Sequence, residues 1–462
     1  MIALILCSFL PFASALLINS GLGIKRGLLI FPITLMIIHL FTGWRWQWVP
    51  AYVVVLGLIL FGLWAVFPQD EKVVPFSQLL LGWVSVRCAI AATIALSAIL
   101  LSASIFLTWA FPSLIFPVPT GDFPVGTVLE AHEAGTFRIW YPAAPQPSDP
   151  LYPYLLNRRI SGLPSFVYSH LRGKLTGAFI NPSLASKPSA FPVVVYDHGA
   201  NSFPEDNTFR LIELASHGFV VAAIAHPRAF EDYGISTQLA QEPSLFNERL
   251  ASVVVPERVK DVRQVVRQLS RLNTQSGTFR NRLNLDSFGL LGYSLGGSVL
   301  SEYCLEDRRC TVVVNLDGGS FGKARQGVRA AFLQLSQSVL LPSEPVKNPQ
   351  NAMEKTGAYY RQEVSDLLRH TQATHPTYWL RVKGSGHAAF TDLVHWTPMR
   401  FGFFGTLIGK GNARAIAQII NELTICFFNE YLQPVLNESA STFEGKIQEH
   451  SSLLETVELL RL

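Results

Sequence analysis

Four long stretches of apolar residues dominate the N-terminal part of this 462-residue chain. Residues 1–116 carry only seven charged side chains, and between these lie the stretches Ile2–Asn19, Leu28–Trp44, Trp48–Phe67 and Ala89–Phe111. A helix needs about 20 apolar residues to cross the hydrocarbon core of a bilayer. The pattern therefore predicts a membrane region of about four spans over residues 1–111. The first stretch is also compatible with a signal peptide, although it lacks the positive residues that precede one.

The basic residues between these stretches predict the orientation. Two lie in the loop after the first span, one between the second and third, and two flank the loop after the third: Lys25 and Arg26, Arg45, and Lys72 and Arg87. Short cytoplasmic loops carry the excess of lysine and arginine. We therefore expect the first and third loops inside the cell and the large C-terminal part on the extracytoplasmic side.

The pattern changes after Phe111. Residues 112–123 are rich in proline and predict a linker. From residue 124 to about 435, short apolar runs alternate with longer amphipathic patterns, which predicts a mostly parallel sheet with helices on both faces. The predicted strands are Thr136–Tyr141, Pro192–Asp197, Phe219–Ala225, Phe288–Gly292, Thr311–Leu316, Ala330–Leu335 and Tyr378–Val382, and the predicted helices include Asn207–His217, Pro256–Leu272 and Ser298–Glu306. Residues 436–462 form a C-terminal tail to which the pattern assigns no role.

The strongest chemical signal is the motif Gly292-Tyr293-Ser294-Leu295-Gly296-Gly297. G-x-S-x-G alone is weak evidence, but here it follows the apolar run Phe288–Leu291 and precedes a helical pattern that starts at Ser298. This strand–turn–helix context is what a nucleophile elbow requires, because glycines permit the strained turn that exposes the serine hydroxyl. The motif predicts an α/β-hydrolase fold with Ser294 as the nucleophile. The alternative is an ordinary loop between a strand and a helix.

A serine hydroxyl needs a histidine to take its proton, and the histidine needs a carboxylate to fix its tautomer. In this fold the acid follows the serine and the histidine follows the acid. Asp317 comes directly after the apolar run Val312–Leu316, so we expect it at the C-terminal end of a buried strand. Open α/β sheets bind their ligands at that end.

The candidates for the histidine among the residues after Asp317 are His370, His375, His387 and His395. His387 stands in the glycine-containing loop Gly384–Phe390 directly after a predicted strand, which is the expected place for the base. His370 and His375 precede that strand and are expected at the surface, and His395 is the reserve candidate.

The reaction also needs donors for the negative charge that develops on the substrate carbonyl oxygen. The strand that ends at Asp197 leads into a His198-Gly199-Ala200 turn before the nucleophile. The backbone N–H groups of Ala200 and Leu295 are the predicted oxyanion-hole donors. His198 precedes the serine, so we interpret it as shaping the turn.

The hydrolase region, from about residue 119 to 430, resembles the platelet-activating-factor acetylhydrolase family of the lipase-like type. The resemblance rests on the segments Pro124–Thr127, Gly135–Pro142, Asp197–Gly199 and Leu214–Ala223 and on the motifs around Ser294, Asp317 and Gly384–Asp392. It implies metal-independent ester hydrolysis by Ser294, Asp317 and His387, no cofactor, and a preference for short or oxidised acyl chains on phospholipids. The family usually has a serine where this chain has Asp197, and often a bulkier residue than Leu295, so the substrate choice stays open.

The composition adds two constraints. A net charge of +4 without a long basic run gives no electrostatic reason to expect nucleic acid as a partner. Of the five cysteines, Cys304 and Cys310 are close enough in sequence to form a disulfide if the domain is extracytoplasmic, and Cys310 is equally compatible with a small buried residue.

Together these patterns predict a membrane-anchored serine ester hydrolase that acts on lipid or amphiphilic esters. Two alternatives stay open: the same residues acting on an amide, lactone or polymer ester, and a catalytically inactive binding or regulatory module. The segment Ala229–Val255, which mixes aromatic and polar residues, is either a rim or lid over the serine or a surface insertion.

Overall fold

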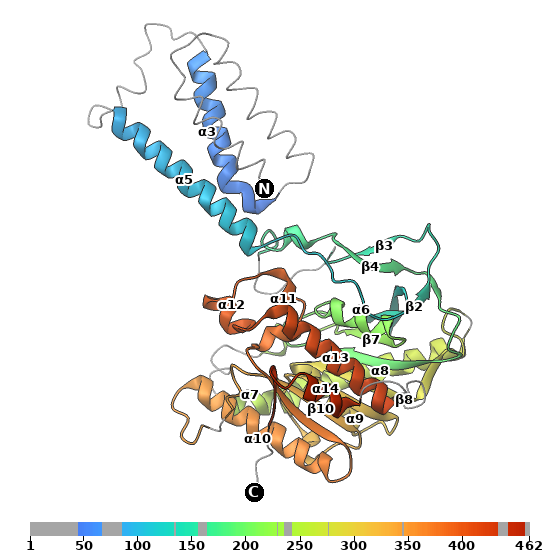
Figure 1. The fold of residues 1–462 in the computed structure, drawn as a ribbon. Helices are drawn as coiled ribbons and strands as arrows, with labels where there is room; N and C mark the ends of the chain where they lie inside the picture. Colours follow the sequence, from blue (N-terminus) through green and yellow to red (C-terminus); the bar gives the residue numbers. More distant parts are fainter. Residues whose placement is uncertain are drawn as a thin grey trace. The chain divides into compact units, whose positions relative to one another are not determined.

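The computed structural model describes residues 45–66, 86–133, 135–155, 164–228, 230–234, 243–275, 277–343, 346–432 and 442–457. The chain divides into two compact units (Figure 1). The first comprises Met1–Ser113 and Pro164–His170, and the second comprises Leu114–Leu163 and Leu171–Leu462. Each unit is described by itself below.

Two apolar helices make up most of the described part of the first unit. A short 3-10 turn, η1 (Trp46–Trp48), leads into α3 (Val49–Val66), and α5 (Val86–Ala110) follows later in the chain. One segment of the described residues, Ala91–Ala110, is long and apolar enough to cross a membrane. The structure thus supports one candidate span where the sequence predicts four. The first two predicted spans lie outside the described residues, and α3 covers the third.

Hydrogen bonds to hydroxyl groups of α5 connect this helix to η1 and to the start of α3. The backbone N–H of Ala51 donates to Ser104 Oγ at 2.9 Å, and Trp48 Nε1 donates to Thr108 Oγ1 at 2.9 Å. Large apolar side chains on the same helices face outward; Leu60 and Ile99 are 57% and 64% exposed. Apolar outer surfaces with small hydroxyl residues between helices are typical of helices packed in a bilayer.

One large mixed sheet organises the second unit, in the order β12-β11-β10-β9-β8-β6-β7-β2-β1-β4-β3, with β5 paired to β2. The neighbouring strands β11, β10, β9, β8, β6 and β7 are parallel. In contrast, β2 is antiparallel to β1 and β7, and β12 is antiparallel to β11. Their bounds are β1 Val125–His132, β2 Gly135–Ala144, β3 Leu151–Pro153, β4 Leu175–Ile180, β5 Ser183–Leu184, β6 Phe191–Asp197, β7 Val220–Ala225, β8 Leu283–Tyr293, β9 Cys310–Leu316, β10 Ala331–Gln337, β11 Thr377–Val382 and β12 Leu454–Thr456.

Helices cover both faces of this sheet because successive residues of the central strands point to opposite faces, and these residues are apolar on both faces. In β6, Val193 and Val195 pack in one core with α8, α9 and α10, while Val194 and Tyr196 pack in the other with α6 and α13. The helices are α6 Thr208–Ser216, α7 Pro243–Arg249, α8 Val255–Thr274, α9 Leu295–Cys304, α10 Ala352–Gln372, α11 Leu393–Trp396, α12 Gly402–Leu407, α13 Ala413–Leu432 and α14 Phe443–Glu449, with short turns η2 Ser169–Leu171, η3 Phe230–Tyr233, η5 Leu250–Val254, η6 Lys323–Gln326 and η7 His387–Phe390. This architecture is the predicted α/β class.

Two features of the second unit go beyond the sequence patterns. Cys304, at the end of α9, forms a disulfide with Cys310, at the start of β9, so the pairing that the sequence left open is present. The C-terminal segment, which the sequence treats as a tail, contributes α14 and β12. Leu454 of β12 is buried in the core and pairs with Val382 of β11.

Candidate active site

The turn between β8 and α9 holds Ser294 in a rare backbone conformation. Ser294 has φ = +53° and ψ = −122°, a backbone conformation that residues other than glycine seldom adopt. Gly296 makes this turn possible, because a Cβ at its position would overlap the carbonyl oxygen of Asp197. The Ser294 N–H donates to the Leu316 carbonyl at 2.9 Å, which ties the turn to the end of β9. The strand–turn–helix geometry is that of a nucleophile elbow.

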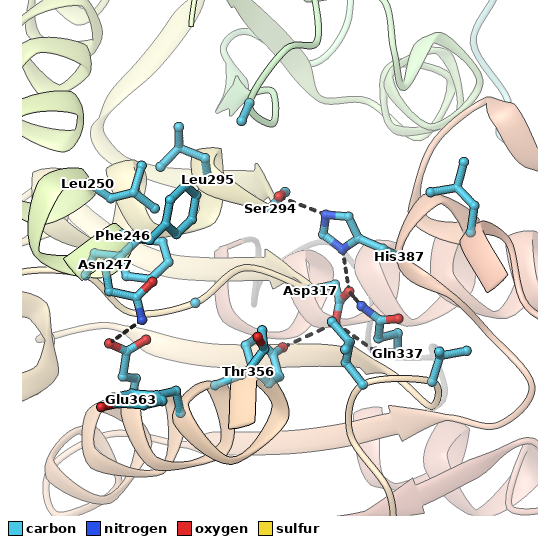
Figure 2. A pocket seen from close by; sticks show the side chains of 18 of the residues that line it. Phe246, Asn247, Leu250, Ser294, Leu295, Asp317, Gln337, Thr356, Glu363 and His387 are labelled. Carbon is cyan, nitrogen blue, oxygen red and sulfur yellow. Dashed lines mark hydrogen bonds and ion pairs between the residues drawn. The ribbon is translucent and has the colours of Figure 1, made fainter. Parts of the chain in front are cut away.

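The three predicted catalytic side chains lie in one hydrogen-bonded series (Figure 2). His387 Nε2 is 2.9 Å from Ser294 Oγ, and His387 Nδ1 is 2.6 Å from Asp317 Oδ2. The Asp317 side chain is 1% exposed, whereas that of His387 is 36% exposed. Ser294 and His387 are 93 positions apart in the chain. They come within hydrogen-bonding distance because the parallel strands that precede them, β8 and β11, end at the same edge of the sheet.

Asp317 has further partners that the sequence analysis missed. Gln337 donates to it twice, from its backbone N–H to Oδ1 at 2.8 Å and from Nε2 to Oδ2 at 2.7 Å. The Tyr360 hydroxyl of α10 also donates to Oδ1, at 3.3 Å. Gln337 is the last residue of β10, the strand beside β9. Its position near the C-terminal end of a predicted strand, like that of Asp317, is the sequence signal by which it could have been identified. These donors fix the orientation of the carboxyl group.

A cavity of about 510 Å³ opens at Ser294. The predicted oxyanion donors Ala200 and Leu295 both line it, and Leu295 is the first residue of α9, where N–H groups have no intrahelical acceptor. Phe246 and Leu250, from the segment 229–255 whose role was left open, also line it. The remaining lining residues are Asn247, Ser294, Asp317, Gly319, Phe321, Gln337, Val339, Leu340, Thr356, Tyr359, Tyr360, Glu363, His387, Phe403, Thr406 and Leu407. The wall is thus largely apolar, as an acyl or alkyl chain requires.

One carboxyl group in this cavity stands apart from the hydrogen-bonded series (Figure 2). Glu363 of α10 is buried and accepts a hydrogen bond from Asn247 Nδ2 at 3.1 Å. Burial raises the pKa of Glu363 to about 7, although the nearby Arg325 opposes the shift. Near neutral pH this side chain is therefore a mixture of the neutral acid and the carboxylate.

Two of the other candidate histidines have different partners. His395, the reserve candidate, lies on α11 and packs edge-on against Phe209 with ring centroids 4.6 Å apart. Burial lowers the pKa of His395 to about 4, so it is a neutral core residue near pH 7. His370 is exposed on α10, where its Nδ1 is 2.7 Å from the Asp366 carbonyl.

A buried carboxyl group supports the loop that carries His387. Asp392 accepts hydrogen bonds from the Phe209 N–H at 3.1 Å and from the Tyr154 hydroxyl at 2.9 Å. Trp396 Nε1 in turn donates to that hydroxyl at 3.2 Å. Burial raises the pKa of Asp392 to about 8 despite these donors.

We expect the substitution Asp392→Asn to flatten the pH dependence of stability. The folded-state pKa is raised far above the ordinary value of 3.8, so the stability linked to Asp392 is fully present below about pH 4 and is lost as the pH rises through about 8. Asparagine does not ionise, so the melting temperature of the variant minus that of the wild type should rise by several degrees between pH 5 and pH 9. Thermal unfolding in detergent measures this. A constant difference across that range would contradict the assignment.

Comparisons with known proteins bear on this geometry. Residues 110–268 match the family model described as "Platelet-activating factor acetylhydrolase, isoform II". A platelet-activating factor acetylhydrolase from Bos taurus is 23% identical over 377 residues, which cover 71% of this chain and 80% of the relative. One from Cavia porcellus is 23% identical over 266 residues, which cover 52% of this chain and 58% of the relative.

A solved structure shares the fold. A ferulic acid esterase from Streptomyces cinnamoneus superimposes with a TM-score of 0.53 and 22% sequence identity, covering 75% of this chain and 100% of the esterase chain. At this identity the likeness concerns the fold alone. Together with the mostly parallel sheet between two helical layers, it fits the predicted α/β-hydrolase fold.

Proposed function

We propose that this chain, which belongs to the platelet-activating factor acetylhydrolase, isoform II, family, is a membrane-anchored serine hydrolase that cleaves lipid or other short-acyl carboxylic esters. The observation that carries the proposal is the hydrogen-bonded series of Ser294, His387 and Asp317 at the opening of a largely apolar cavity. The relatives that are named acetylhydrolases support a lipid ester as the substrate class.

The geometry supports a two-step acyl transfer. Ser294 Oγ attacks the ester carbonyl carbon while His387 Nε2 takes the hydroxyl proton, and Asp317 stabilises the imidazolium through Nδ1–H. The carbonyl oxygen becomes an oxyanion, for which the N–H groups of Ala200 and Leu295 are the proposed donors. The intermediate collapses as His387 returns the proton to the leaving alcohol, and the acyl group stays on Ser294.

Water completes the cycle by the same route. His387 Nε2 takes a proton from a water molecule that attacks the acyl-enzyme carbonyl, and the resulting intermediate releases the carboxylic acid. The proton then returns to Ser294 Oγ. The reaction consumes one ester and one water and yields one alcohol and one acid, and every proton transfer uses His387.

The N-terminal region is proposed to anchor the enzyme in a membrane, with about four spans as the sequence predicts. The apolar helix segment Ala91–Ala110 supports at least one span. The distribution of basic residues supports an extracytoplasmic catalytic domain, and so does the disulfide Cys304–Cys310, because disulfides persist in oxidising compartments. Anchoring would keep the cavity close to lipid esters.

Activity-based labelling tests the proposal. We expect the detergent-solubilised wild type to react covalently with a fluorophosphonate probe and the Ser294→Ala variant not to react. The wild type should also hydrolyse a phospholipid with an sn-2 acetyl group at least 10-fold faster than the same phospholipid with a long sn-2 chain. Both reactions are followed on protein of verified folding.

The same assay separates the alternatives. Reaction with the probe but preference for an amide, a lactone or a polymer ester would support a related hydrolase with another substrate. A folded wild type that neither reacts with the probe nor hydrolyses any acyl substrate would instead favour the inactive binding module.

A further inference from the structure

A buried cluster of charged groups lies directly behind the turn that leads to Ala200. It comprises Asp197 at the end of β6, His226 after β7, and Arg258 and Asp261 on α8. The side chains of Asp197, His226 and Arg258 are 0%, 1% and 1% exposed. Because burying charges is costly unless they are paired, a cluster of this kind needs a structural or functional reason.

Arg258 binds the carbonyl groups of the turn itself. Its Nη1 donates to the His198 carbonyl oxygen at 2.9 Å, and its Nη2 makes a weaker contact with the Gly199 carbonyl oxygen at 3.5 Å. His198 Nδ1 lies 2.8 Å from the same Gly199 oxygen. Burial, together with the charge of Arg258, lowers the pKa of His198 well below 6.5, so this neutral ring donates through Nδ1–H. Two side chains thus hold the Gly199 carbonyl.

Holding this carbonyl also sets the direction of the next N–H group. The peptide bond between Gly199 and Ala200 is trans, and in a planar trans peptide the C=O and the following N–H point in opposite directions. The Gly199 carbonyl points toward Arg258, so the Ala200 N–H points away from it. Ala200 lines the cavity at Ser294, and a Cβ at Gly199 would lie 3.1 Å from the Ser294 Cβ. The turn therefore lies against the nucleophile.

The remaining charges fix Arg258 in place. Arg258 Nη1 lies 3.7 Å from Asp197 Oδ1, and His226 Nε2 lies 2.7 Å from the same oxygen. Burial raises the pKa of Asp197, but the facing His226 and Arg258 outweigh this effect and leave the pKa lowered. His226 Nδ1 is also 2.7 Å from Asp261 Oδ2. His226 thus lies between the two carboxyl groups and holds Asp197 beside Arg258.

We propose that Arg258 is a positioning residue for the oxyanion hole: by binding the carbonyls of His198 and Gly199, it aims the Ala200 N–H at the substrate oxygen. The inference rests on the proposed ester hydrolysis and deepens it. Arg258 touches neither Ser294 nor the cavity and acts through the turn. Asp197, which replaces the serine usual in the family, provides the buried carboxylate that pairs with this guanidinium.

The test compares Arg258→Met with the wild type on 4-nitrophenyl acetate and on its thionoester. The thionoester places sulfur, a poor hydrogen-bond acceptor, where the oxyanion forms, so only the oxygen ester benefits from well-aimed N–H donors. Deleting an oxyanion donor costs about 10²–10³-fold in kcat, and a misaimed one should cost less. We expect a fall of about 10- to 100-fold in kcat, little change in KM, and a similar fall in the ester-to-thionoester ratio.

Controls separate aiming from folding. Active sites are counted by fluorophosphonate titration taken to completion, and Arg263→Met, an exposed position on the same helix, is the matched control and should retain wild-type values. If Arg258→Met does not fold, Arg258→Lys replaces it and should give an intermediate ratio. A wild-type ratio in the substituted protein overturns the inference, whether or not kcat falls. Failure of the wild type to react with the probe would instead remove the proposed function.

Discussion

The His387→Ala variant is expected to lose ester hydrolysis by about 10⁴- to 10⁶-fold in kcat/KM. Without this ring, Ser294 has no base within 2.9 Å and its hydroxyl stays protonated and weakly nucleophilic. Labelling by a fluorophosphonate should slow by a comparable factor. The measurement is the second-order rate of labelling together with steady-state hydrolysis of a short-acyl ester.

Two further variants make this result specific. His370→Ala removes an exposed histidine of α10 and should behave like the wild type. The double variant Ser294→Ala/His387→Ala should lose no more than either single variant, because groups that act as one unit have non-additive effects. If His387→Ala keeps more than a tenth of the wild-type rate, another group is the base.

The second large effect is expected from Asp317→Asn. The side-chain amide can donate a hydrogen bond to His387 Nδ1, which then favours the tautomer with its proton on Nε2. That nitrogen faces Ser294 Oγ and can no longer accept the serine proton. We expect kcat to fall by about 10⁴-fold while KM stays within a few-fold.

A structural control accompanies this substitution because Asp317 is buried. Gln337 and Tyr360 donate to its oxygens, so an amide there leaves some donors facing an NH₂ group. Circular dichroism and thermal unfolding should show a folded protein, and the rate is compared with that of Gln337→Glu, which alters the same contact from the other side. A folded Asp317→Asn variant with near-wild-type kcat would falsify the assigned role.

Much of the central sheet could be predicted because its strands are buried on both faces. Continuous apolar runs such as Val193–Val195 and Val312–Val314 lie in β6 and β9, as expected. The turn at Ser294 was equally predictable from its glycines, and the structure leaves no room for a Cβ at either of them: Gly296 lies against the Asp197 backbone and Gly297 against the Asn315 side chain. The strands at the β1 side of the sheet were harder, because β3 and β5 are only three and two residues long.

The partners of the site were not predictable from pattern alone. Gln337 and Tyr360 reach Asp317 only because β10 lies beside β9 and α10 packs over it, and that order is a property of the whole fold. The sequence analysis gives Arg258 no role, yet its side chain is buried on the inner face of α8, where the turn after β6 offers two carbonyls and a carboxylate. Hydrophobic periodicity predicts which apolar side chains are buried. It does not predict a charged side chain that is buried because polar partners surround it.

The pairing of β12 with β11 has a consequence for how this protein can be handled. Leu454–Thr456 form the outermost strand beside β11, whose end leads into the loop of His387. Shortening the chain after α13 would therefore leave the N–H and C=O groups of β11 facing solvent, and unpaired sheet margins of this kind recruit other chains. Affinity tags and truncations at the C-terminus thus put both solubility and the geometry of the proposed base at risk.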